Sequence, residues 1–198
     1  MNVLGNVKRG RMFIVSAPAG TGKTTLVRML TAEFSCVVES VSFTTRAPRA
    51  CEVPGCDYHF ISTEEFEARI REGEFLEHAK VFEYHYGTSR KTVESSLASG
   101  KHVILVIDTQ GALQLMGTCD AVFIFIRPPN MEELRKRLSA RSSETPAAIE
   151  QRLSWAAKEI ALKSRYEYEI VNETLDVAYD VLRAIVIAEE HKHRKEQP

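Results

Sequence analysis

APAGTGKT at residues 17–24, directly after the apolar run MFIVS at residues 12–16, decides the fold of this chain. The apolar run is typical of a buried strand, and residues 23–34 have the spacing of a helix. Gly20 and Gly22 let the backbone curl so that successive N–H groups face a polyphosphate, and the helix N-terminus adds about half a positive charge. We therefore predict a phosphate-binding loop that consists of Ala17, Pro18, Ala19, Gly20, Thr21, Gly22, Lys23 and Thr24.

Two side chains of this loop have separate predicted tasks. Lys23 can reach the outer phosphates of a nucleotide, and the Thr24 hydroxyl can ligate Mg²⁺. An ordinary glycine turn before a helix is the alternative, but it does not account for the lysine and the threonine in register. The loop departs from the general pattern at Ala17, where glycine is usual.

Length and composition limit the class of protein. The 198 residues suit one compact unit, and 44% hydrophobic with 27% charged residues is the profile of a globular chain. The formal net charge of -1 provides no overall basic field for nucleic acid or for an anionic membrane surface. No run approaches the roughly 18 apolar residues that span a bilayer. We expect a cytoplasmic protein whose partners include neither nucleic acid nor a membrane.

The cysteines are too few and too irregularly placed for a disulfide framework; they are Cys36, Cys51, Cys56 and Cys119. Cys51 and Cys56 could form half of a zinc site, but no second Cys/His pair has a matching spacing. Free thiols in a reducing compartment are therefore expected.

Apolar runs and helical patterns alternate along the chain, which predicts an α/β fold with a mostly parallel central sheet. The runs VILVI at 103–107 and AVFIFI at 121–126 are unbroken, as strands buried on both faces require. Residues 43–57 are expected to be an irregular loop that binds a ligand. Further strands are expected at 36–42, at 75–86 with a turn and at 169–171, and helices at 62–72, 89–99, 130–138, 146–164 and before residue 191.

Asp108 follows the strand at 103–107 directly and should emerge at its carboxyl end, where ligands bind in open α/β sheets. It could face a ligand, a metal ion or the water shell of the metal. The alternative is that Asp108 caps the helix that follows, and both roles could coexist.

Arg46 and Arg49 lie three residues apart in the predicted binding loop, with Glu52 and Tyr58 close behind. Paired guanidinium groups suit a phosphate monoester, because each gives planar bidentate contacts. A solvated basic loop is the alternative for two isolated arginines.

Several motifs in one order resemble the guanylate kinase family of P-loop nucleoside monophosphate kinases. They are APAGTGKT, TTR-x-P-R with a glutamate three residues beyond, DYHF, EFLEHA and YGTS, and the resemblance extends from about Gly10 to Glu190. It implies a P-loop NTPase-type three-layer fold over residues 10–190, with an inserted GMP-binding subdomain at 42–91, a lid region at 137–152 and a flexible tail at 191–198. It also implies ATP and GMP as substrates and Mg²⁺ as cofactor. We further expect dGMP as an acceptor and a monomer or weak homo-oligomer.

The resemblance also implies roles for individual residues. The GMP phosphate would contact Arg46, Arg49, Tyr58 and Tyr86, and Glu52 would orient Arg49 or its neighbours. The rest of GMP would lie near Ser42, Glu77, Thr88 and Asp108. Metal binding would fall to Thr24 and Asp108, and catalysis to Lys23, Arg46, Arg137, Arg141 and Arg152. Helical spacing alone would make Arg137 and Arg141 an exposed basic face near Glu132 and Glu133, and that alternative stays open.

Glu77 has a chemical argument of its own. Guanine presents two adjacent donors, N1–H and the 2-amino group, and a carboxylate has two acceptors at a matching separation, whereas adenine lacks that donor pair. A buried site built for such hydrogen bonds rejects an analogue that lacks them by as much as about 10⁴ to 10⁵. Without its motif, Glu77 would be read as a solvated strand residue.

The sequence departs from the family at Val106-Ile107-Asp108, where Asp-x-Asp is common, and this weakens the metal assignment. In-line transfer needs no general base, because the acceptor phosphate is already ionised. Closure must exclude water, which predicts movement of residues 42–91 and the lid. A protein-binding module that has lost catalysis and a kinase for another base are the competing functions; the intact loop argues against the first, and Arg46, Arg49 and Glu77 against the second.

Overall fold

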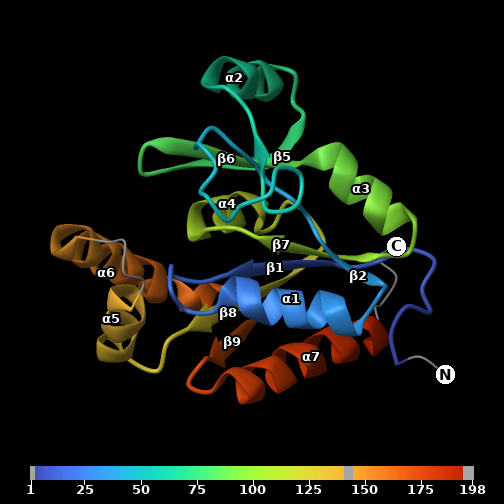
Figure 1. Ribbon diagram of the computed structural model, residues 1–198. Coiled ribbons are helices and arrows are strands. Elements are labelled where there is room, and N and C mark those ends of the chain that lie inside the picture. Colours follow the sequence, from blue (N-terminus) through green and yellow to red (C-terminus); the bar gives the residue numbers. More distant parts are fainter. Residues whose placement is uncertain (1–2, 141–144, 194–198) are drawn as a thin grey trace.

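The central sheet has five parallel strands in the order β2-β7-β1-β8-β9 (Figure 1). The structure is a computed structural model that describes residues 3–140 and 145–193. The strands are β1 (Met12–Ser16), β2 (Val37–Glu39), β7 (His102–Val106), β8 (Ala121–Arg127) and β9 (Tyr168–Val171). Because β1 lies between β7 and β8, the loop after β1 opens where the strand order reverses, which is where open α/β sheets bind ligands.

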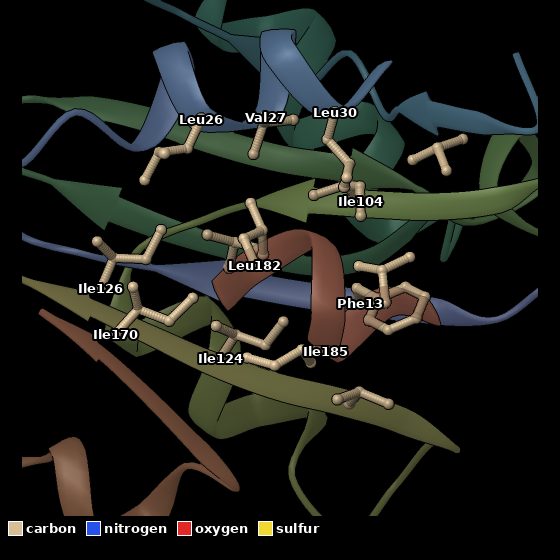
Figure 2. Packing of buried hydrophobic residues seen from close by; sticks show 14 of the residues in the cluster. Phe13, Leu26, Val27, Leu30, Ile104, Ile124, Ile126, Ile170, Leu182 and Ile185 are labelled. Carbon is tan, nitrogen blue, oxygen red and sulfur yellow. The ribbon is translucent and has the colours of Figure 1, made fainter. Parts of the chain in front are cut away.

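Helices cover both faces of this sheet, so the predicted three-layer α/β fold is confirmed. One face packs against α1 (Lys23–Glu33) and α7 (Leu175–His191), and the other against α3 (Arg90–Ala98) and α4 (Thr109–Leu115). Strand β1 alternates between them, because side chains of a strand point to opposite faces in turn. Figure 2 shows Phe13 of β1 in the first of these cores, with Leu30 of α1 and Ile185 of α7.

A second sheet is inserted between β2 and α3, and we call it the small sheet. Its order is β4-β3-β6-β5, and it contains β3 (Phe43–Thr44), β4 (His59–Phe60), β5 (Phe75–Val81) and β6 (Tyr84–Ser89), with α2 (Thr63–Arg71) beside it. Strands β5 and β6 form an antiparallel hairpin, and β3 pairs with β6. In Figure 1 the small sheet lies over α4, against which β5 packs, and α2 lies on the far side of the small sheet. These elements fall within the range predicted for the acceptor subdomain.

Helices α5 (Met131–Ser139) and α6 (Pro146–Ala161) form a separate pair with their own apolar contacts. Leu134 and Leu138 of α5 pack with Leu153 and Ala156 of α6. The predicted lid region at 137–152 falls on this pair, and its member Arg141 lies outside the described residues.

Three segments differ from the sequence prediction. Strand β2 ends at Glu39 rather than at residue 42, because the chain leaves the central sheet there and enters β3 of the small sheet. The stretch predicted as irregular therefore begins with a short strand. Helix α6 ends at Ala161 rather than at residue 164, and a 3₁₀ turn, η1 (Lys163–Arg165), follows it. The turn leads to Tyr166, whose ring centre lies 5.1 Å from that of Phe125. Within the described residues, no helix combines the length and hydropathy of a membrane span.

A buried hydrogen-bonded group joins β7, the N-terminal segment and the end of α7. His102 Nδ1 accepts from the Arg11 N–H at 3.0 Å, so the proton on the ring lies on Nε2, which donates to Glu190 Oε2 at 2.6 Å. Glu190 Oε2 also accepts from the Gly5 N–H at 2.8 Å. Burial alone would raise the pKa of Glu190, but the hydrogen bonds from Gly5 and His102 outweigh it and lower that pKa.

His102→Ala should reduce the free energy of unfolding by about 2–4 kcal/mol, because it leaves the buried Glu190 carboxylate without its ring donor. Urea denaturation at pH 7 measures this change, and the exposed His193→Ala should stay within about 0.5 kcal/mol of the wild type. Since the pKa of folded Glu190 lies below its ordinary 4.5, its stabilisation is present above that pH and is lost as the pH falls through the folded value. The difference between the two proteins should therefore become smaller in acid, and equal stabilities at pH 7 would contradict the assignment.

Candidate functional site

The loop between β1 and α1 is built around two glycines in the left-handed region. Gly20 has φ 90° and Gly22 φ 88°, a conformation that residues with a Cβ rarely adopt. There is no space for a Cβ either, since one on Gly22 would lie 2.6 Å from Asn172 Nδ2. That amide group donates to the Thr21 carbonyl at 2.7 Å and ties the loop to the segment after β9. The sequence-predicted loop geometry is thus held from the far edge of the sheet.

Lys23 crosses the loop and donates from Nζ to the Ala17 carbonyl at 3.1 Å. Burial lowers the pKa of Lys23, and the charges of Glu159, Asp108 and Glu39 oppose this shift in that order. An ammonium group has three donors, so two remain for a phosphate. Lys23, which is predicted to bind phosphate, is therefore fixed to the loop by its hydrogen bond and lies near three carboxylates.

A cavity of about 230 Å³, which we call the central cavity, lies between the loop, the small sheet and α6. It brings together residues that are far apart in the sequence: Ala17, Ala19, Lys23, Ser42, Tyr58, Glu77, Ala79, Val81, Phe82, Tyr86, Val106, Ile107, Asp108, Arg152, Trp155 and Glu159. Nine residues predicted for nucleotide binding or catalysis are among them: Ala17, Ala19, Lys23, Ser42, Tyr58, Glu77, Tyr86, Asp108 and Arg152.

Glu77 is the buried acid of the small sheet, with an exposed fraction of 4%. The Thr88 hydroxyl, on the neighbouring strand β6, donates to its Oε1 at 2.6 Å. Burial raises the pKa of Glu77 to about 7, against the lowering effect of the Thr88 hydrogen bond. Gly111 of α4 leaves the room that the carboxylate occupies, because a Cβ there would lie 2.2 Å from Glu77 Oε2. Glu77 is thus a desolvated acceptor with a fixed position.

Arg46 and Glu52 form a bidentate pair at the other end of the small sheet. Arg46 Nη1 and Nη2 donate to the two carboxylate oxygens of Glu52 at 3.0 and 2.8 Å, and the Arg49 N–H donates to Oε2 at 2.8 Å. Glu52 raises the pKa of Arg46. The guanidinium carbon also lies 5.4 Å from the ring centre of Tyr58, whose ring meets that of Tyr86 at 5.9 Å. Glu52 therefore orients the Arg46 side chain and the Arg49 backbone.

A second cavity of about 210 Å³ adjoins the central one and shares Ser42, Tyr58 and Val106 with it. Its lining includes Thr24 of α1 and Arg49 and Glu52 of the binding loop, together with Glu39 at the end of β2. Burial raises the pKa of Glu39. The hydroxyl and the carboxylate are oxygen donors of the kind that Mg²⁺ prefers.

Asp108 caps α4, as the alternative interpretation allowed. Its Oδ1 accepts from the Gly111 N–H at 3.0 Å, and its Oδ2 accepts from Gln110 Nε2 at 2.9 Å. Because Asp108 also lines the central cavity, the cap and a nucleotide contact can coexist. No group of three or more His, Cys, Asp or Glu side chains in the described part of the chain is arranged to hold a metal ion.

Two of the predicted lid arginines, Arg152 and Arg137, lie in different places in the structure. Arg152 of α6 lines the central cavity. Arg137 of α5 instead donates to Glu133 Oε1 and to the Asn172 carbonyl, both at 3.0 Å, in a separate recess beside Gly20 and Gly22. Arg137 therefore lies near the loop and pairs with Glu133, one of the two acids that the basic-face alternative placed near it.

Sequence reasoning missed Glu39, Gly111, Asn172, Trp155 and Glu159. Glu159 is only 5% exposed and faces the cavity from α6, where burial raises its pKa to about 7. A charged residue in the apolar stripe of a helix is a signal that could have indicated Glu159. Gly111 and Asn172 carry no comparable signal, because their importance comes from partners distant in the sequence.

Comparison with known proteins agrees with this geometry. A profile of the family described as Guanylate kinase matches residues 9–189. The curated guanylate kinase of Protochlamydia amoebophila (strain UWE25) is 56% identical over 191 residues, which cover 96% of this chain and 97% of that protein. The guanylate kinase of Chlamydia felis (strain Fe/C-56) is 48% identical over 92% of this chain and 90% of its own length.

A solved structure is similar as well. The crystal structure of guanylate kinase from Anaplasma phagocytophilum matches with a TM-score of 0.78 and 38% sequence identity, over 93% of this chain and 88% of that chain. The agreement covers the central sheet and nearly the whole chain, so it concerns the complete arrangement rather than the phosphate loop alone. On the family match and the identity to these relatives, the chain belongs to the guanylate kinase family.

Proposed function

We propose that this chain transfers the terminal phosphoryl group of ATP to the phosphate of GMP, giving ADP and GDP for purine nucleotide metabolism. Guanylate kinase activity follows from the family and from relatives matched over nearly their whole length. The proposal concerns the substrates, the metal ion and the residues. One observation carries it: the buried carboxylate of Glu77 faces the same cavity as Lys23 of the phosphate loop.

The base of GMP fits the Glu77 end of the central cavity. Glu77 has one oxygen that accepts from Thr88, and its remaining lone pairs are available to the N1–H and 2-amino donors of guanine. Adenine would leave the carboxylate desolvated without a matching donor pair. Guanine selection therefore comes from the penalty on an unpaired buried acceptor. The 2′ position has no assigned contact, and dGMP is proposed as an acceptor on that basis.

The phosphate of GMP fits the group formed by Arg46, Arg49, Tyr58 and Tyr86. Because Glu52 holds Arg46 with two hydrogen bonds, the guanidinium group is oriented before a ligand arrives. A charge that is already positioned loses little side-chain entropy on binding. Ser42 and Tyr58 line both cavities and would lie between acceptor and donor.

The transfer itself depends on position and charge. The outer phosphates of ATP would accept from Lys23 and from the N–H groups of the glycine loop, and Arg152 would approach from α6. No side chain has to remove a proton, since the attacking phosphate oxygen is ionised. Arg137 and Arg141 stay predicted lid residues, and Arg141 lies outside the described part of the chain.

Mg²⁺ fits the oxygen donors near the loop. In proteins this ion keeps several waters and binds through one or two side chains together with substrate phosphates. Thr24 would hold it, with Glu39 in the same cavity as an added acid. Asp108 stays a predicted ligand, although both of its oxygens accept hydrogen bonds from residues of α4. When bound, Mg²⁺ neutralises charge that develops on the phosphates.

A binding module without catalysis and a kinase for another base remain the competing functions, and a cytoplasmic monomer or weak homo-oligomer stays a prediction. A coupled assay for ADP separates the functions, with MgATP and each of GMP, dGMP, AMP, CMP and UMP. We expect ADP formation that requires GMP or dGMP. Turnover chiefly with another monophosphate would refute the guanine assignment, and no turnover with any of them would favour the module.

The affinity for GMP should depend on the protonation of Glu77. Because burial raises the pKa of Glu77 to about 7, the carboxylate must lose a proton before it accepts from guanine at lower pH. The dissociation constant should therefore increase about tenfold per pH unit below 7 and level off above it. Calorimetric titration between pH 6 and 8.5 measures this dependence.

Glu77→Gln is the matched control for this titration. It should weaken GMP binding by roughly 10² or more, because the amide presents a donor where an acceptor is needed. The only pH dependence left near neutrality should come from the GMP phosphate, whose second pKa is about 6. A wild-type profile that matches this control would show that Glu77 does not contact the base.

Gly111→Ala should impair GMP binding without unfolding the protein. The added methyl group would occupy the place of Glu77 Oε2 and displace the carboxylate, which we expect to raise KM for GMP about tenfold or more. Alanine is the better helix former by about 1 kcal/mol, so the melting temperature should not fall. KM for ATP serves as the internal control and should change less than about twofold. An unchanged KM for GMP would contradict the proposed base site.

A further inference from the structure

The β5–β6 hairpin brings an aromatic ring of the small sheet onto helix α6. Val81 and Tyr84 pair across the hairpin, so Phe82 and Glu83 form a two-residue turn. The Phe82 ring lies 5.5 Å from the ring of Trp155, with an interplanar angle of 43°. Both side chains line the central cavity. In Figure 1 the hairpin and α6 extend toward the same end of the central sheet, so this contact joins the small sheet to the lid pair.

Phe82 has an unusual backbone conformation for an aromatic residue. Its φ is 56°, and among residues 3–140 and 145–193 no other non-glycine residue has a positive φ. The first position of a two-residue turn with a positive φ is normally occupied by glycine, asparagine or aspartate. Residues held in such sparsely populated regions persist where the surroundings determine them, and they gather at functional segments.

Burial in a core does not explain this conformation. Phe82 is 43% exposed, so much of its ring remains in contact with water. What the conformation achieves is the position of the ring on Trp155 at the edge of the nucleotide cavity. A glycine or asparagine would suit the turn better and could not make this contact. The sequence therefore favours the contact over an unstrained turn.

Trp155 lies on the same face of α6 as two charged residues that line the cavity proposed for the nucleotides. Arg152 lies three residues before it and Glu159 four residues after it, so the three side chains lie on one side of α6, and all line the central cavity. The ammonium group of Lys158 lies 5.9 Å from the Trp155 ring centre and gives it a second contact. Because α6 is a rigid helix, a shift of Trp155 also shifts Arg152 relative to Lys23.

We propose that Phe82 and Trp155 are positioning residues whose ring contact couples the GMP site to the ATP site. GMP holds the small sheet through Glu77 and Arg46, the hairpin carries Phe82 against Trp155, and α6 then presents Arg152 to the phosphates. Coupling of this kind is reciprocal, so a bound ATP analogue tightens GMP binding by the same factor. The inference rests on the proposed function for the identity of the two ligands.

Fluorescence can measure the coupling directly, because Trp155 is the single tryptophan of the chain. The wild type is titrated with GMP, with and without a non-hydrolysable ATP analogue and Mg²⁺. We expect the fluorescence of Trp155 to change on GMP binding, and the dissociation constant of GMP to fall about five- to tenfold when the analogue is present.

Variants of Phe82 test the ring and the strain separately. Phe82→Gly removes both the ring and the strain, Phe82→Ala removes the ring alone, and Phe82→Tyr retains the ring. Tyr84→Ala, on the exposed part of the same hairpin, is the matched control. We expect Phe82→Gly and Phe82→Ala to lose the coupling and to lower kcat about tenfold, whereas Phe82→Tyr and Tyr84→Ala keep both.

If the Phe82 ring served only the stability of the fold, Phe82→Gly would melt at a lower temperature than the wild type. Since glycine suits the turn, Phe82→Gly should melt at the wild-type temperature or roughly 2–4 °C higher, and still turn over slowly. Wild-type coupling and kcat in Phe82→Gly would overturn the inference while the proposed function stood. If the wild type shows no GMP-dependent turnover, the proposed function is overturned. If its fluorescence titration then also shows no coupling between the two ligands, the inference is overturned as well.

Discussion

Desolvation of charge is the constraint on which the site depends. Lys23, Glu77 and Glu159 face one cavity. Burial lowers the pKa of the lysine and raises the pKa values of the two acids, and in each case this favours the neutral form of the group. In water such groups would be screened and indifferent to one another, whereas in a cavity their interactions are several times stronger. A nucleotide that supplies donors to Glu77 and negative charge to Lys23 would restore the charged forms of these two groups, so binding energy and selectivity would have the same source.

The layers of the fold hold these groups in place. Lys23 comes from the start of α1, Glu77 from the small sheet and Glu159 from the lid pair, and none of the three elements could enclose the cavity alone. The parallel sheet holds Lys23 in position, because β1, which leads into the loop before it, lies between β7 and β8. The hydrogen bond from Asn172 to Thr21 then closes the loop from the edge strand. Precise placement of charge thus comes from packing between elements rather than from any one motif.

Local patterns were enough to predict the frame of the molecule. The unbroken runs of β7 and β8 and the glycines of the loop act over short distances, so the sheet, the loop and the helix after it could be recognised from the sequence. The motif around Glu77 predicted a contact with guanine, which stays a prediction, and the structure shows that the side chain is buried. Gly111, Asn172 and Phe82 could not be recognised, because a missing Cβ, a buried amide and a strained turn matter only through partners 34, 151 and 73 positions away. The end of β2 was missed since it depends on where the chain changes sheets.

The small sheet leaves the central one after β2 and returns through α3 to β7, and these two strands are neighbours. Both junctions therefore lie at one edge of the central sheet, and the insertion meets the central layers at α4, where Gln110 and Gln114 form hydrogen bonds with β5. Such a layout makes the insertion an exchangeable cassette: a lineage can enlarge, shrink or replace it, and so change which acceptor is recognised, while the phosphate-donor half keeps its register. Diversification of acceptors around one conserved donor scaffold is the evolutionary path that this topology leaves open.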